Sequence, residues 1–432
     1  MNFFKILIKR IFQYEAQLVL KRYKPKIIAI VGSVGKTTTR DAIYLLLSKK
    51  YFVRKSEKSF TAELGVPLAI IGCEYGTGSV NQWVSNLLEG LQLLLVPRRY
   101  PEWLILEIDG DKPGDISGIS SWLSPDIVVV TAIGDIPAHI ESFSSKEIFI
   151  IEKRHILDAL GSDGLVIYNA DDTVATQLVS SVTCRKISCA LGEKGDVKAT
   201  TPTILYAGKQ KDIPIGLTYD VTLGDNHGTL THLNVLGIHV VYASLLAIAI
   251  GIEKNIPWQD CIGLGSTLSA LPGRMKIIQG INDSVIIDDS YNASPLAMDQ
   301  ALDVCQHIQT THNKILVVGD MLELGKYSAD SHRHVAIRAK DIMQYVFCVG
   351  IRAQRVYEEL INLGFDKERT KVFDRAELAG LAAKEVLGAG DIVLVKGSQA
   401  MRMERVVEQI MRHPEDAPKL LVRQEPEWIE RD

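Results

Sequence analysis

Apolar and polar positions divide the chain into short apolar runs and longer segments of helical periodicity. The first run, residues 27–31, consists of five apolar residues, mostly β-branched, which is typical of a fully buried strand. Similar runs occupy residues 103–108, 127–131, 165–168 and 185–190. Other segments, such as residues 40–47 and 239–251, carry the apolar spacing of helices. This alternation predicts an α/β fold with a mostly parallel sheet and helices on both of its faces.

The pattern changes in the second half of the chain. Between residues 199 and 236 the segments are short and alternating, with Gly and Asn turns, which predicts an antiparallel insertion or flank. Strand-like runs return at residues 284–288, 314–318, 345–349 and 392–396. Helical segments separate these runs, so we expect a second, Rossmann-like, doubly wound α/β domain. The predicted division is an N-terminal helix (1–25), a central domain (26–271), a C-terminal domain (272–413) and a tail (414–432).

Residues 1–25 combine an apolar helix face with an excess of positive charge. A helical wheel places one group of apolar residues on a common face: Phe4, Leu7, Ile8, Ile11 and Leu18. Residues 1–26 hold seven Lys or Arg against the single acid Glu15. Such a helix either lies on the anionic inner surface of a membrane or packs against the body of the protein, and the sequence leaves both open. The chain contains no apolar run of membrane-spanning length and no signal-peptide pattern.

Composition narrows the class of protein. A formal charge of −4 and the absence of a basic patch interleaved with aromatic residues predict no nucleic-acid partner. The six cysteines are scattered without a CxxC pair, which predicts reduced thiols in a cytoplasmic protein. With 432 residues and 47% apolar content, the chain can form two or three domains with their own cores.

The clearest chemical signal follows the first apolar run, in the stretch Gly32-Ser33-Val34-Gly35-Lys36-Thr37-Thr38. A strand, a glycine loop and a helix in that order form a cradle for phosphate groups. Lys36 is expected to reach the β- and γ-phosphates of ATP, and the Thr37 hydroxyl to ligate Mg²⁺. The general pattern has a glycine where this chain has Ile30. An ordinary turn would not need Lys-Thr after the second glycine, so the stretch predicts a nucleotide site.

Three more candidates lie near the predicted strand ends or in the following segments. Glu107 ends a strand, where a carboxylate can face the ligand crevice of a parallel sheet and complete Mg²⁺ coordination, or be a solvated acid. His139 follows another strand in a loop, where a lone histidine is often only structural or exposed. Lys153 lies in a charged helical run that is typical of a solvated face. The residues alone leave each of these alternatives open.

The later part of the chain adds weaker candidates. Asn169 begins an Asn-Ala-Asp-Asp stretch after a strand, which is also a common turn composition. Asp289 and Asn292 lie between a predicted strand and a helix, where they would cap the helix or face a ligand. Arg274, directly after the Leu271-Pro272-Gly273 boundary, could reach a phosphate from a hinge.

Taken together, these stretches resemble the Mur ligases, the ATP-dependent amino-acid-adding enzymes of bacterial peptidoglycan synthesis. The resemblance runs from about Lys26 to Arg412 and rests on eight motifs: GSVGKTTT (32–39), ELGVP (63–67), LEIDGDKPGDI (106–116), NADD (169–172), LPGRM (271–275), IDDSYNASP (287–295), GDMLELG (319–325) and VKGSQAMRME (395–404). The resemblance implies a P-loop central domain, a C-terminal domain that closes over it, and a ligase that uses ATP and Mg²⁺ to join a carboxylate to an amine through an acyl phosphate. The last four motifs are most similar to those of the members that add D-Ala-D-Ala to a muropeptide.

The resemblance also implies roles for individual residues. Lys36 and Thr37 would serve the ATP phosphates and Mg²⁺, and Glu107 and His139 would complete the metal site. Lys153 is similar to the lysine that the family carbamylates. Nucleotide contacts are implied for a further group of residues: Asn169, Arg274, Asp289, Asn292 and Asp320.

The chain departs from the family pattern at three places. Thr61 and Ala132 stand where the family usually has asparagine. The family member most like this chain carries a whole N-terminal domain for a uridine nucleotide, whereas about 25 residues precede the loop strand here. We therefore expect the acceptor to be recognised in another way. The alternatives are a different acceptor, such as a lipid-linked peptidoglycan precursor or a polyglutamate-like chain, with another amine donor, or a non-catalytic nucleotide-binding subunit.

Overall fold

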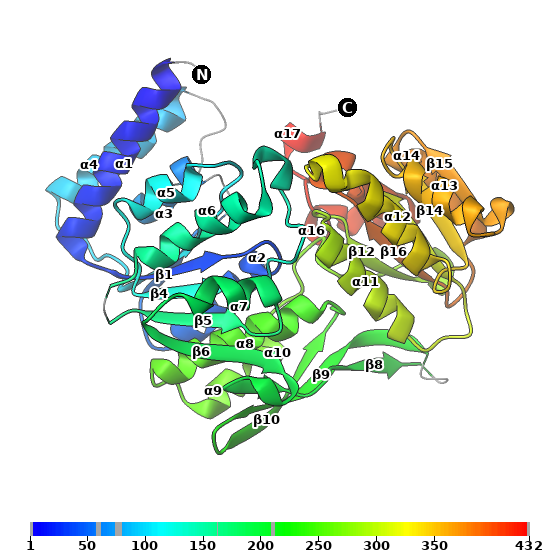
Figure 1. Ribbon diagram of the computed structural model, residues 1–432, viewed down its shortest axis with the longest axis horizontal. Coiled ribbons are helices and arrows are strands. Elements are labelled where there is room, and N and C mark those ends of the chain that lie inside the picture. The colour runs from blue at the N-terminus through cyan, green and yellow to red at the C-terminus, as the bar shows by residue number, and fades with distance from the viewer. Residues whose placement is uncertain (1–2, 58–61, 74–79, 162, 209–211, 430–432) are drawn as a thin grey trace.

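The computed structural model describes residues 3–57, 62–73, 80–161, 163–208 and 212–429, with the side chains of residues 3–6, 62, 80 and 427 left out (Figure 1). The described chain forms one ten-stranded sheet and one six-stranded sheet. Helices cover both faces of each sheet. The predicted α/β class with a parallel sheet and a second doubly wound domain is confirmed.

The larger sheet has the strand order β10-β9-β7-β6-β5-β4-β1-β3-β2, and β8 pairs with β9. Its strands are β1 (Lys26–Val31), β2 (Val53–Lys55), β3 (Trp103–Glu107), β4 (Ile127–Val130), β5 (Leu165–Asn169), β6 (Arg185–Leu191), β7 (Val197–Ala199), β8 (Thr203–Ala207), β9 (Ile213–Leu223) and β10 (Asn226–Leu233). Strands β1 to β7 run parallel, whereas β8, β9 and β10 form the predicted antiparallel flank. The strand that the first apolar run predicted, β1, lies inside the sheet between β3 and β4.

Alternate residues of β1 reach two different cores. Ile28 and Ile30 belong to the core under α2 (Lys36–Leu47) and α8 (Ile238–Glu253), with α9 (Trp258–Ile262) and α10 (Leu264–Thr267) beside them. Ile27, Ala29 and Val31 belong to the core on the other face. The helices on that face are α1 (Phe3–Tyr23), α3 (Ala62–Ile71), α4 (Val80–Leu95), α5 (Asp115–Ser120), α6 (Lys146–Asp158) and α7 (Thr173–Ser180). Burial on both faces explains why the strand is continuously apolar.

The smaller sheet has the strand order β11-β12-β16-β13-β14-β15. Its strands are β11 (Lys276–Gln279), β12 (Val285–Asp289), β13 (Lys314–Gly319), β14 (Tyr345–Val349), β15 (Thr370–Phe373) and β16 (Ile392–Lys396). Only the edge strand β11, which no apolar run predicted, is antiparallel to its neighbour. One face carries α11 (Pro295–His307), α12 (Ser328–Ala339) and α13 (Gln354–Asn362), and the other carries α14 (Ala376–Val386) and α15 (Glu404–Ile410).

The N-terminal helix α1 packs on α3 and α4 through a different face from the one predicted. Its buried residues are Ile8, Phe12, Glu15, Ala16 and Val19. Two residues of the predicted apolar face, Leu7 and Ile11, are exposed instead, and the side chain of Phe4 lies outside the described residues. The wheel groups these residues on one face, but α1 packs through a neighbouring face that shares Ile8 with it and centres on Phe12, whose ring lies 5.7 Å from that of Trp83. None of the described helices is long and apolar enough to cross a membrane.

The tail folds back onto the C-terminal domain through α16 (Ala417–Leu420) and α17 (Pro426–Ile429). Between these two helices the Arg423 side chain is buried. It donates hydrogen bonds to the Ser290 and Tyr291 carbonyls and forms an ion pair with Glu404. The tail therefore supports the loop that follows β12.

Candidate functional site

The loop between β1 and α2 forms one wall of a cavity of ≈210 Å³. Gly32 has φ 145°, and a Cβ there would overlap the Thr131 hydroxyl, so only glycine fits this position. The backbone N–H groups of Ser33 and Val34 donate to the Ala132 carbonyl, which fixes the path of the loop. Gly35, at φ 86°, precedes α2, so the positive end of the helix faces the cavity.

The two polar residues at the start of α2 contact the end of β3 and the segment that follows it. The Lys36 Nζ lies 3.0 Å from the Gly32 carbonyl oxygen and 3.1 Å from Asp109 Oδ2. The Thr37 hydroxyl is 3.2 Å from Glu107 Oε2, and the other oxygen of Glu107 is 3.0 Å from Arg40 Nη1. The predicted neighbours Thr37 and Glu107 are thus together, with their oxygen atoms directed at one another.

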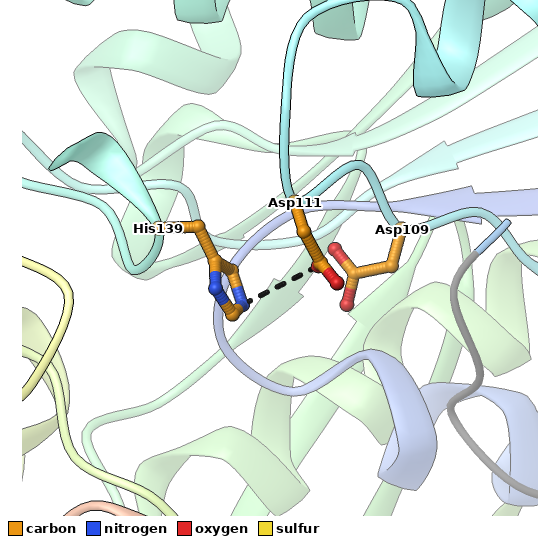
Figure 2. A group of neighbouring side chains, drawn as sticks. All are labelled: Asp109, Asp111 and His139. Atoms are coloured by element: carbon orange, nitrogen blue, oxygen red, sulfur yellow. Dashed lines mark ion pairs between the residues drawn. The ribbon is translucent and has the colours of Figure 1, made fainter. Parts of the chain in front are cut away.

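Figure 2 shows a cluster of two carboxylates and a histidine. One of the carboxylates, that of Asp109, is the ion-pair partner of Lys36. One ligand atom each from Asp109, Asp111 and His139 lie within 4.8 Å of one another. The His139 Nε2 is 3.7 Å from Asp111 Oδ1, as the dashed line in Figure 2 shows. Among the described residues this is the group with the spacing of a metal site. The sequence pattern predicted His139 but neither aspartate, although Asp109 and Asp111 lie only two and four residues after Glu107, the last residue of β3.

Lys153 is buried in α6 rather than exposed on a solvated face. Only 2% of its side chain is accessible, and its Nζ lies 3.4 Å from Asp109 Oδ1. Asp109 therefore lies between two ammonium groups, those of Lys36 and Lys153. The Phe149 ring, 5.2 Å from the Lys153 Nζ, covers the same side of the cavity.

Burial and neighbouring charges shift the pKa values of the side chains in and around this cluster. Burial by itself would raise the pKa of Asp109, but the ammonium groups of Lys36 and Lys153 outweigh it and hold that pKa below its usual range. Burial lowers the pKa of Lys153, and the Asp109 carboxylate offsets only part of this effect. Burial also disfavours a charged His139, yet Glu323, Asp109 and Asp111 together raise its pKa. The histidine is consequently stabilised in its protonated form when no cation is present.

The opposite wall of the cavity comes from the C-terminal domain. The Arg274 guanidinium lies 3.9 Å from the centre of the Tyr291 ring. Asp289 is 2.5 Å from the Lys396 ammonium, which also donates to the Asn292 carbonyl. All five of these side chains line the same cavity as the loop of α2. Lys396 was not predicted, because a lysine at the end of an apolar strand has no distinctive sequence pattern.

A direct contact joins the two domains at the edge of the cavity. The His139 Nδ1 lies 2.6 Å from Glu323 Oε2, and the Glu141 N–H donates to the Glu323 carbonyl. Both His139 and Glu323 have positive φ, at 65° and 63°. The histidine of the metal-like cluster is therefore held by a residue of the other domain.

Two predicted nucleotide contacts lie outside the main cavity. Asn169 is buried behind the loop, beside Val34 and Gly35, and its side-chain oxygen accepts from the Asp171 N–H. Asp320 is buried in the C-terminal domain, where its carboxylate accepts from the N–H groups of Arg352 and Ala353. Their roles toward a nucleotide stay predictions. Thr61, one of the departures from the family pattern, lies outside the described residues.

His239 is a lining residue that the sequence did not single out. It lies at the start of α8, next to Gly237, and its side chain lines the cavity beside the phosphate loop. Burial lowers its pKa to about 4, so its ring is neutral. A single histidine before a long apolar helix is usually structural, which is why the sequence carried no signal for it.

The glycine loop, the helix behind it and the carboxylates at the adjacent strand end define a nucleotide-binding protein of the P-loop class. Two family descriptions match the chain: the Mur ligase middle domain over residues 30–251, and the Mur ligase, glutamate ligase domain over residues 273–399. The first of these matches spans more than half of the chain. The chain belongs to the Mur ligase family.

Similar proteins cover most of the chain. The UDP-N-acetylmuramoyl-tripeptide–D-alanyl-D-alanine ligase of Bacillus subtilis is 27% identical over 403 residues, which are 93% of this chain and 79% of the relative. The enzyme of the same name from Escherichia coli K12 is 25% identical, over 92% and 79%. The crystal structure of the MurF ligase from Thermotoga maritima in complex with ADP has a TM-score of 0.73 and 22% identity, covering 93% and 83% of the two chains. The likeness to that structure supports the fold.

Proposed function

We propose that the chain is an ATP-dependent ligase that adds D-Ala-D-Ala to a muropeptide in peptidoglycan synthesis. The observation that carries this proposal is the cavity in which Lys36 of the phosphate loop faces the Asp109, Asp111 and His139 cluster. The choice of substrates is supported by the relatives, which are named as UDP-N-acetylmuramoyl-tripeptide–D-alanyl-D-alanine ligases. The structure of a similar protein with ADP supports ATP as the nucleotide.

In this proposal the ATP phosphates lie on residues 32–38. Lys36 and the N-terminus of α2 stabilise the charge of the phosphoryl group as it is transferred. Arg274 and Asn292 contact the nucleotide from the C-terminal side. Tyr291 packs against Arg274, and Lys396, which pairs with Asp289, donates to the Asn292 carbonyl. The central part, residues 26–271, and the C-terminal part, residues 272–413, act as two units that close on the substrates and exclude water.

The reaction has two steps. A carboxylate oxygen of the acceptor attacks the γ-phosphorus of ATP, so that the bond to ADP breaks and an acyl phosphate forms. The amine of the donor then attacks the acyl carbon, the peptide bond forms, and phosphate leaves with the former carboxylate oxygen. The amine loses a proton in the second step.

The donor set fits Mg²⁺. Carboxylate and hydroxyl oxygens are the ligands that this ion prefers, and Thr37, Glu107, Asp109 and Asp111 supply them. A bound Mg²⁺ would neutralise phosphate charge during transfer. His139 can ligate an ion only in its neutral form. Because its Nδ1 faces Glu323 and its Nε2 faces Asp111, ligation through Nε2 would leave the Nδ1–H to donate to Glu323, which is the common arrangement of a metal-bound histidine.

Lys153 is proposed to react with CO₂ to form a carbamate. Its burial lowers its pKa, which increases the fraction of neutral amine, and the neutral amine is the form that attacks CO₂. The added carboxylate would lie beside Asp109, and a bound cation would offset the charge of both. In the unmodified protein Lys153 instead neutralises Asp109.

A second cavity adjoins the first and is open to the acceptor or the amine. It is lined by residues of both domains: His139, Asn292, Leu322, Glu323, Ser398, Gln399, Ala400, Arg402 and Trp428. Because His139 and Asn292 line both cavities, a substrate in the second would reach the phosphates in the first. We assign it to the non-nucleotide substrates.

We also propose that the enzyme is cytoplasmic and associates peripherally with the inner surface of the membrane through residues 1–25. The exposed apolar residues Leu7 and Ile11 support this proposal. It makes a lipid-linked peptidoglycan precursor the second candidate acceptor, since such an acceptor would be met at the same surface.

The test is ATP-dependent formation of the ligated product. Purified full-length protein is mixed with ATP, Mg²⁺, D-Ala-D-Ala and a panel of acceptors that includes a UDP-muramoyl tripeptide and a lipid-linked precursor. We expect equal amounts of ADP, phosphate and peptide product with at least one of these acceptors. Nucleotide binding without product from any of them would instead support a non-catalytic role.

A further inference from the structure

Eight of the eighteen large apolar side chains that are exposed in the described part of the chain lie on α1, on α4 or directly after α4. On α4, Val84, Leu88, Leu91 and Leu95 are spaced by four, three and four residues, so they form one stripe along the helix. Their exposed fractions lie between 44% and 76%. Val96 extends the stripe past the end of the helix. A stripe of this spacing normally faces a core, yet here it faces outward.

The neighbouring helix α1 carries a second stripe, formed by Leu7, Ile11 and Tyr14. The two helices run in the same direction, because Phe12 contacts Trp83 near the start of α4 and the Tyr23 hydroxyl bonds to the Leu93 carbonyl near its end. In Figure 1 they lie side by side at the outer edge of the larger domain, away from α13 and α14.

Both stripes face the same side of this helix pair. At about 100° per residue, each stripe is roughly a third of a turn around its helix from the residues that contact the other helix. On α1, the ion pair of Lys9 with Glu63 marks the direction of α3, and the stripe lies away from it. On α4, the contact of the Asn86 carbonyl with the Cys73 thiol marks the same direction, and the stripe again lies away from it. We call the two stripes together the α1/α4 surface.

Positive charge borders the end of the α1/α4 surface. Lys21, Arg22 and Lys24 lie at the end of α1, and Arg98 and Arg99 follow α4. The bond from Arg22 Nη1 to the Leu94 carbonyl brings these two groups of residues together. Glu89 pairs with Arg98, but within the described part of the chain no acid pairs with the other four. The border is therefore positive.

We propose that the α1/α4 surface docks on an anionic lipid bilayer. This inference rests on the peripheral membrane association proposed above, and it names the surface that makes the contact. The apolar side chains would enter the boundary between headgroups and acyl chains, while the basic residues would meet lipid phosphates. A second copy of the chain fits less well, because the same surface on that copy offers the positive border no opposite charge, whereas lipid phosphates do. The α1/α4 surface is larger than the apolar face of α1 that the sequence predicted, because α4 supplies most of its apolar side chains.

The test measures co-sedimentation of the full chain with vesicles of phosphatidylcholine and phosphatidylglycerol in equal parts. A double variant, L88D with L91D, places two charges in the stripe and should weaken binding at least about tenfold, because charged groups are strongly disfavoured at that depth. The matched control is I337D on α12, an apolar residue of similar exposure in the other domain, which should bind as the parent does. Binding of the parent should also weaken as salt is raised.

Two results would overturn the proposal. The first is equal sedimentation of the parent protein and the L88D/L91D variant. The second is a parent protein that elutes as a dimer in gel filtration while the L88D/L91D variant elutes as a monomer, with neither protein binding vesicles. Vesicle binding needs no ATP turnover, so an active ligase that ignores vesicles refutes only this surface, whereas a vesicle-binding chain without ligase activity refutes only the proposed reaction.

Discussion

Glu15 offers a quantitative test of the contact between α1 and α4. Its side chain is 6% exposed, and its carboxylate lies so close to Gly90 of α4 that a Cβ there would overlap it. The Oε2 atom has no hydrogen-bond partner among the described residues. Burial raises the pKa of Glu15 from 4.5 to about 7. Replacement by glutamine keeps the shape and removes the ionisation.

The sign and size of the effect follow from linkage. Below pH 4.5 the carboxyl group is neutral in both folded and unfolded chains, so it costs nothing. As pH rises, the unfolded chain releases this proton first, and stability falls until the pH passes the folded pKa of about 7. A shift of this size corresponds to at most about 3.5 kcal/mol, at about 1.4 kcal/mol per pKa unit. The free energy of unfolding of E15Q, relative to that of the parent, should therefore rise by up to that amount between acid and mildly alkaline pH.

The assay is urea unfolding followed by tryptophan fluorescence, since Trp83 contacts Phe12 across this helix pair. Parent, E15Q and the control E408Q, at an exposed glutamate, are compared at about pH 5 and about pH 8. The gain of E15Q over the parent should be larger at the higher pH, and E408Q should show no such change. A stability difference between E15Q and the parent that is the same at both pH values would refute the reasoning.

Three further predictions concern the site and its supports. Lys36→Ala should lower ATP turnover at least about 100-fold without changing the melting temperature much, because it removes the ammonium group that faces the phosphates; near-normal turnover in a folded variant would rule out this role. Lys153→Ala should lose activity and regain part of it with short carboxylic acids, and the parent should lose activity when dissolved CO₂ is removed; activity that ignores both treatments would leave Lys153 as a partner of Asp109 only. Arg423→Ala should cost about 3 kcal/mol in urea unfolding, because it leaves Glu404 buried with one partner fewer; Arg423→Lys should keep part of that stability, and an unchanged midpoint in Arg423→Ala would show that the tail does not support the loop after β12.

Much of the fold could be predicted because its signals are local. The strands β1, β3, β4 and β5 are buried on both faces, so each appears in the sequence as a continuous apolar run. The edge strands β2 and β11 have mixed patterns and short lengths, and they escaped detection. The interface of α1 also escaped, because the positions of α3 and α4 depend on contacts far along the chain.

The site was also predictable only in part, because some of its contacts join segments that are far apart in the sequence. The glycine loop with Lys36 and Thr37 is contiguous, so its pattern identifies it. The contacts of Asp109 with Lys36 and Lys153 join three separate segments, and their proximity depends on tertiary packing. Asp109 and Asp111 could still have been found, since they lie in the loop after a parallel strand, at the sheet edge where ligands bind, as was argued for Glu107.

The most direct test of the central claim is an isotope transfer measurement. The acceptor carboxylate is labelled with oxygen-18, and the full-length enzyme is supplied with ATP, Mg²⁺ and D-Ala-D-Ala. If the acceptor is activated as an acyl phosphate in the cavity of Lys36 and Asp109, the released phosphate must carry one labelled oxygen for each peptide bond formed. Ligated product accompanied by unlabelled phosphate would contradict the account.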